Sequence, residues 1–93
     1  MEPQVIGPMP RICEFYGAVI RMYHNEHGPP HFHAEHGGLS AAIAFDGTIL
    51  RGGLHPRLLL SVRRWANQRS SELRENWDRA RRHDSLVSIA PPE

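Results

Sequence analysis

The spacing of apolar residues changes once along this chain, and that change most constrains what the chain can fold into. Up to about residue 51, short apolar runs alternate with polar residues and are separated by turn signals. From Pro56 onward, apolar residues recur every three or four positions. A period of two is typical of strands buried on one face, and a period of 3.6 is typical of an amphipathic helix. The sequence therefore predicts a sheet followed by helix.

Turn-forming residues divide the first half of the chain into short strands. Gly17, Gly37-Gly38 and Asp46-Gly47 separate successive apolar runs, and an Asp-Gly pair strongly favours a tight hairpin. Residues 24–30 are too rich in Gly, Pro and Asn for regular structure. We expect an antiparallel meander of four to five strands, at 11–15, 18–23, 31–35, 39–45 and 48–51.

The second half of the chain has the pattern of one long amphipathic helix. The stripe comprises Leu58, Val62, Trp65, Arg69, Leu73, Trp77 and Ala80. Ser70-Ser71 could cap a second helix, with Glu72 in its first turn. Because the stripe keeps its phase through these serines, we favour a single C-terminal helix bent near Ser70. We expect both tryptophans to be core or interface residues, and residues 86–89 to form an edge strand. The fold class that follows is α+β, with the sheet packed against the helix.

Length and composition favour one small domain. The chain has 93 residues, 40% of them apolar and 23% charged, which is typical of a globular protein. Residues 1–10 contain three prolines and predict a flexible arm before a domain at 11–93. The lone Cys13 excludes an internal disulfide and is more typical of a small buried residue than of a nucleophile. The chain shows neither a signal peptide nor a membrane span, so we expect a cytoplasmic protein.

Basic residues gather in the helical region. Residues 51–82 contain nine arginines and three acidic residues, whereas the first fifty residues are net acidic. Arginine binds phosphate and carboxylate groups through paired hydrogen bonds, so this segment suggests an acidic partner, RNA or DNA. A solvated helix surface with Glu–Arg pairs is the alternative. The candidate nucleic-acid or partner-binding residues are Arg63, Arg64, Arg74, Arg79, Arg81 and Arg82.

Five of the seven histidines lie between His24 and His36. If Phe32 and Ala34 face the core, His31 and His33 share the opposite face of their strand. Two imidazoles at this spacing suit a zinc ion or another divalent metal. His27 is a candidate third ligand; the other candidates are His24, His36, His55, Glu26 and Glu35.

A metal-free site is a second interpretation of the same residues. Imidazole titrates near neutral pH, so His27, His31 and His33 could act as general acid and base on a phosphodiester. Arg21 would then stabilise the developing charge, and Tyr23 would orient the ligand. A third interpretation is structural, with the histidines hydrogen-bonded on a polar sheet face.

Several motifs resemble those of a family of small bacterial and phage proteins classed as a domain of unknown function. The resemblance extends from Pro10 to Pro91. Its motifs here are Pro10-Arg11-Ile12, Tyr16–Met22, His27–His33 with its Pro-Pro-His-x-His core, the Asp-Gly hairpin, Trp65 and Trp77. The resemblance implies a two-gene module with a second small protein that looks able to bind DNA. It also implies a role as a toxin–antitoxin component or transcriptional regulator, with emphasis on His27, His31 and His33.

Three functions therefore remain open. The first is a component of such a module that acts on RNA or another phosphate ligand through its histidines and contacts a small cognate protein. The second is a non-catalytic regulator or inhibitor that binds a protein or nucleic acid. The third is a histidine-ligated metal protein. Enzymatic activity is left open, and the small core with two tryptophans is compatible with a homodimer.

Overall fold

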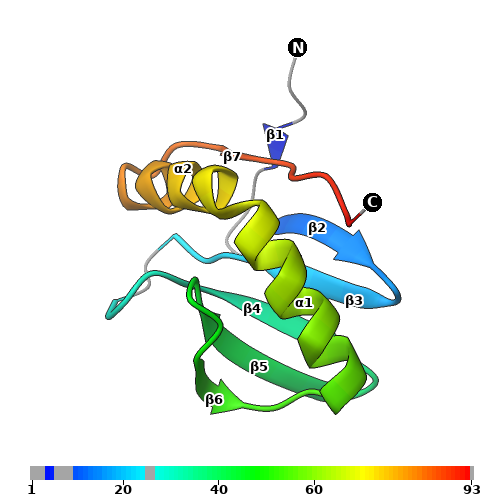
Figure 1. The fold of residues 1–93 in the computed structure, drawn as a ribbon. Helices are drawn as coiled ribbons and strands as arrows, with labels where there is room; N and C mark the ends of the chain where they lie inside the picture. Colours follow the sequence, from blue (N-terminus) through cyan, green and yellow to red (C-terminus); the bar gives the residue numbers. More distant parts are fainter. Residues whose placement is uncertain (1–3, 6–9, 25–26, 93) are drawn as a thin grey trace.

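Two helices cover one face of a five-stranded antiparallel sheet (Figure 1). The computed structural model describes residues 4–5, 10–24 and 27–92. The strands are β2 (Arg11–Phe15), β3 (Ala18–Arg21), β4 (His31–His36), β5 (Leu39–Ala44) and β6 (Ile49–Gly52), and they are adjacent in that order. The α+β class and the antiparallel meander are thus confirmed.

Tight turns connect the strands where the sequence predicts them. Tyr16 and Gly17 have φ values of 52° and 77°, and Gly37 and Gly38 have 55° and 83°. Two successive positive φ values define the hairpin turns whose twist matches that of the strands. At the third hairpin the Thr48 amide donates to Asp46 Oδ1 at 2.9 Å, and this bond lowers the pKa of the Asp46 carboxyl.

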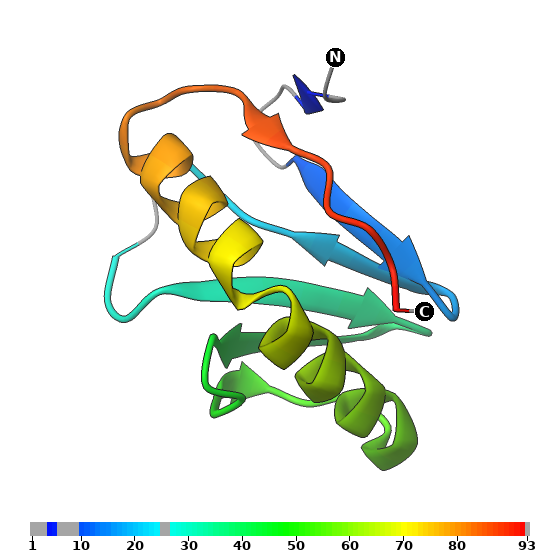
Figure 2. The same ribbon diagram turned by 45° about the horizontal axis from the view of Figure 1, so that its top comes forward.

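The prediction of one long C-terminal helix is wrong, because the structure has two helices (Figure 2). They are α1 (Pro56–Gln68) and α2 (Ser70–Arg81). The break falls at Arg69, whose φ and ψ of −111° and 25° leave the helical region. A straight helix over 56–81 would be about 39 Å long at 1.5 Å per residue, whereas the molecule measures 33 Å along its longest axis. The break allows both helices to remain over the sheet.

Neither described helix is long and apolar enough to cross a bilayer.

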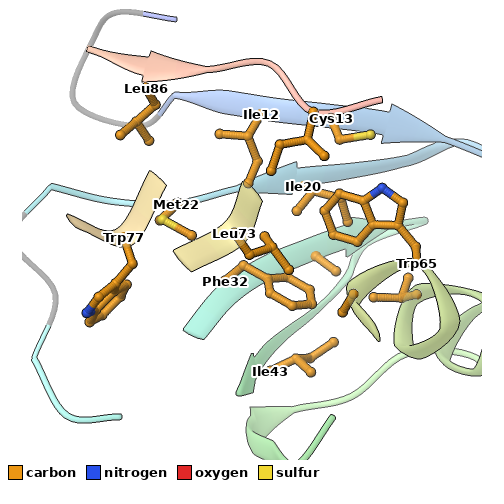
Figure 3. Packing of buried hydrophobic residues seen from close by; sticks show 14 of the residues in the cluster. Ile12, Cys13, Ile20, Met22, Phe32, Ile43, Trp65, Leu73, Trp77 and Leu86 are labelled. Atoms are coloured by element: carbon orange, nitrogen blue, oxygen red, sulfur yellow. The ribbon is translucent and has the colours of Figure 1, made fainter. Parts of the chain in front are cut away.

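The core lies between the sheet and the helices (Figure 3). Ile20, Phe32 and Trp65 are fully buried there, and the rings of Phe32 and Trp65 meet edge-on at 5.7 Å. Trp77 is 4% exposed. Both tryptophans therefore occupy the core, as the helical stripe predicts.

The C-terminal segment runs beside β2 (Figure 2). Its short strand β7 (Leu86–Val87) pairs with β1 (Gln4–Val5), so part of the predicted flexible arm is a strand. Residues 1–3 and 6–9 of that arm lie outside the described residues. Further along, the Ile89 amide donates to the Ile12 carbonyl at 2.8 Å. The Trp65 indole N–H donates to the Ala90 carbonyl at 2.8 Å.

The buried side chain of Asn76 attaches this segment to α2. Its Nδ2 donates to the Val87 carbonyl, and its Oδ1 accepts from the Val87 amide, both at 2.8 Å. Asn76 is 1% exposed, so water cannot replace either bond.

We predict that Asn76→Ala lowers the free energy of unfolding by about 3 kcal/mol, because it leaves two backbone groups without their partner. Chemical denaturation measures the change. Asn67→Ala, at an exposed position of α1, is the control and should change stability by less than about 0.5 kcal/mol. Equal effects of the two substitutions would contradict this role of Asn76.

Candidate functional site

The strand register places several predicted site residues on the sheet face opposite the helices, here called the outer face. Ile20 pairs with Ala34, and both are fully buried toward the helices. Arg21 pairs with His33 on the outer face, because successive residues of a strand point to opposite faces. The two strands are held by the β3–β4 hydrogen bonds, so Arg21 and His33 are fixed side by side.

Three aromatic rings, Tyr23, His31 and His33, lie in contact and are here called the ring cluster. Tyr23 stacks on His33, with ring centroids 4.4 Å apart and an interplanar angle of 26°. The rings of His31 and His33 are 5.2 Å apart at 70°. Tyr23 and His33 are half-buried, whereas His31 is 3% exposed. Of the two histidines in the motif, only His33 is accessible to a ligand of appreciable size.

His31 is held by the chain on both sides. Its ring lies 5.4 Å from the Trp77 ring of α2, and its Nδ1 lies 2.8 Å from the Pro29 carbonyl oxygen. A carbonyl oxygen only accepts hydrogen bonds, so Nδ1 of His31 is the donor. In neutral His31 the other nitrogen, Nε2, is then an acceptor.

Charged side chains surround His33 on the outer face. The Arg21 Nε lies 3.3 Å from Glu35 Oε1, in a half-exposed ion pair. Arg51, which the sequence pattern did not indicate, pairs in register with Ala42, and Ala42 pairs with His33. The registers of the β4–β5 and β5–β6 hairpins place Arg51 on this face. In the sequence, strand alternation together with the Asp-Gly turn is the signal that could have predicted this position.

The metal-site prediction needs a third ligand beside His31 and His33, and His27 is one of the candidates. This residue is exposed in the β3–β4 loop. Among residues 10–24 and 27–92, no three His, Cys, Asp or Glu side chains are grouped so that they could hold a metal ion. Glu26, another predicted ligand, lies outside the described residues. A site for zinc or another divalent ion, with His27, His31 and His33, remains a prediction.

Three other histidines have local contacts of their own. His24 Nε2 lies 3.2 Å from the Asp84 carbonyl oxygen. His55 Nδ1 accepts the Arg57 amide and caps α1. The His36 ring lies next to Gly17 in the neighbouring hairpin turn.

Four of the six candidate helix arginines make contacts within the chain. Arg79 lies 3.1 Å from Glu75, and Arg82 lies 3.0 Å from Asp84. Arg63 donates to the Gly47 carbonyl at 2.9 Å, and the Arg74 guanidinium lies 5.7 Å from the centre of the Phe45 ring. Arg64 and Arg81 are exposed. Nucleic-acid or partner binding by these helix residues stays a prediction.

Cys13 is buried with 6% exposure, as its strand position predicts. Burial raises the pKa of its thiol, which lowers the thiolate population at neutral pH. A nucleophilic role is therefore disfavoured.

The fold defines a small α+β domain with a polar outer sheet face and two helices on the other face. Residues 17–78 match the family model described as a domain of unknown function (DUF4160), and the chain belongs to this family. The match confirms the resemblance to a family of unknown function. No curated protein and no solved structure matches the chain.

We predict that neutral His31 carries its proton on Nδ1, because the Pro29 carbonyl accepts from that nitrogen. Long-range ¹H–¹⁵N correlation spectra of the uniformly labelled protein distinguish the two tautomers. Spectra of His31→Gln assign the signals. A neutral ring protonated on Nε2 would contradict the observed hydrogen bond.

Proposed function

We propose that this chain binds RNA or another phosphate ligand on its outer face, as one component of a bacterial or phage two-gene module of the toxin–antitoxin type. The observation that carries the proposal is the Tyr23–His33 stack, with Arg21 directly across from His33. Aromatic side chains stack on bases, and guanidinium groups bind phosphate. A ring that can stack on a base and a guanidinium that can bind a phosphate are thus available at neighbouring positions.

The burial of His31 favours binding over acid–base catalysis by a histidine pair. A general acid or base must reach the proton that it transfers, directly or through one water. His31 is 3% exposed and packs between Trp77 and His33. We assign it as a positioning residue that supports the His33 ring. This supports the non-catalytic regulator among the functions that the sequence left open.

The cognate protein of the module would contact the helices. The two-gene organisation is implied by the resemblance. α1 and α2 lie on one face of the sheet (Figure 1), and the strand register places Arg21 and His33 on the other face. Arg64 and Arg81 are exposed on these helices and are the candidates for this contact. Such an arrangement leaves the outer face open to RNA while the partner is bound.

We predict that Tyr23→Leu and His33→Ala each weaken RNA binding roughly 5- to 100-fold, the range expected for one lost base stack. Fluorescence anisotropy with a labelled mixed-sequence 12-nucleotide RNA measures the affinity. Tyr16→Leu is a matched control at an exposed turn residue and should bind like the unmodified chain. Circular dichroism verifies that each variant is folded.

Two results would contradict the proposal. One is unchanged affinity in folded Tyr23→Leu and His33→Ala. The other is cleavage of the RNA by the unmodified chain that is lost in His33→Ala, since a binding role predicts intact RNA.

A further inference from the structure

One row of the outer face crosses all five strands of the sheet and contains four basic residues. Arg11 pairs with Arg21, and Arg21 with His33; His33 pairs with Ala42, and Ala42 with Arg51. Directly opposed residues of antiparallel strands point to the same face. These five residues, here called the basic row, therefore lie side by side from one sheet edge to the other.

We propose that the basic row is a track for one single strand of RNA that runs across the β-strands. The inference rests on the proposed function, because it uses the same face, and it extends the ligand from one nucleotide to a chain of several. Neighbouring strands lie about 4.8 Å apart, so the row spans about 19 Å. At the duplex spacing of about 3.4 Å per phosphate this length holds at most about six nucleotides, and an extended single strand fills it with fewer.

The side chains along the row differ in how their charge is compensated. Arg11 lies 2.7 Å from Glu14, and Arg21 lies 3.3 Å from Glu35, so the β2 and β3 end of the row carries ion pairs. Arg51 is exposed at the β6 end. We therefore expect the Arg51 guanidinium to provide a stronger phosphate contact than Arg11 or Arg21.

Ala42 is the covered position of the basic row, with 3% exposure. It lies between His33 and Arg51, and its methyl group is the smallest side chain of the five. A base at this position would therefore contact the imidazole of His33 and the guanidinium of Arg51 rather than the Ala42 methyl group. Both groups stack on or contact bases in single-strand binding surfaces.

The residues beside the basic row favour RNA over DNA. Glu35 and Ser40 pair in the adjacent row, and together with Val19 and the Gly37-Gly38 turn they line a hollow of about 520 Å³. A carboxylate repels phosphate but accepts a hydrogen bond from a 2′-hydroxyl, as a serine hydroxyl also does. The 2′-hydroxyl is the group by which a protein distinguishes RNA from DNA.

The test is a length series of labelled oligouridylates of two, four, eight and twelve nucleotides, measured by fluorescence anisotropy. We expect the affinity to rise with length and to level off once the row is filled. Arg51→Gln should weaken binding of the 12-mer about 3- to 10-fold. It should also reduce the slope of log K against log salt by about 0.7, the value for one lost phosphate contact on a single strand. Arg57→Gln, an exposed arginine at the start of α1, is the matched control and should show neither change.

The outcomes separate the track from the proposed function. If the dinucleotide binds as tightly as the 12-mer and Arg51→Gln has no effect, the track is overturned. The proposed function would still stand if Tyr23→Leu and His33→Ala weaken binding. If those two variants bind normally as well, both proposals fail.

A deoxyuridine 12-mer that binds as tightly as its RNA counterpart would overturn the assignment to RNA. Equal competition by polyglutamate would show that the row binds negative charge without recognising a nucleic-acid strand, and would also overturn the track.

Discussion

The packing of Phe32 and Ala34 against the helices is the constraint on which the rest of the structure depends. Both are fully buried, and Phe32 contacts Trp65 edge-on. A slip of one residue in β4 would turn these two side chains outward and bury His33 and Glu35. The free energy lost by exposing Phe32 and Ala34 and burying His33 and Glu35 fixes the register of β4. The same register places His33 next to Arg21, so the core determines the geometry of the outer face.

This constraint gives a physical reason for the Pro-Pro-His-x-His motif. The Pro29 carbonyl accepts the His31 Nδ1–H, and His31 then packs against Trp77. Phe32 enters the core, and His33 stacks on Tyr23. The two histidines of the motif thus have different environments: His31 is covered by α2, and His33 is half-buried on the outer face. The motif joins a core anchor to a half-buried residue of the outer face within five residues.

The C-terminal half of the chain covers the sheet in two places, on one face and along one edge. Because the chain changes direction at Arg69, α1 and α2 both remain over the sheet. The C-terminal segment then returns along β2, where Asn76 binds the Val87 backbone and Trp65 binds the Ala90 carbonyl. These contacts cover the β2 edge of the sheet, and both described helices lie on the face opposite Arg21 and His33.

The sequence by itself determined the local elements, because their causes are local. Alternation around Phe32 and the glycine turns predicted the strands, and the apolar stripe placed Trp65 and Trp77 in the core. Strand alternation also put His31 and His33 on one face. The tertiary structure decided between one bent helix and two, with the break at Arg69. It also decided the burial of His31 by Trp77 from a distant helix and the alignment of Arg11 with Arg51 across five strands. The burial depends on a contact between distant segments. The alignment depends on all four strand pairings, of which the turn signals predict only the three hairpins.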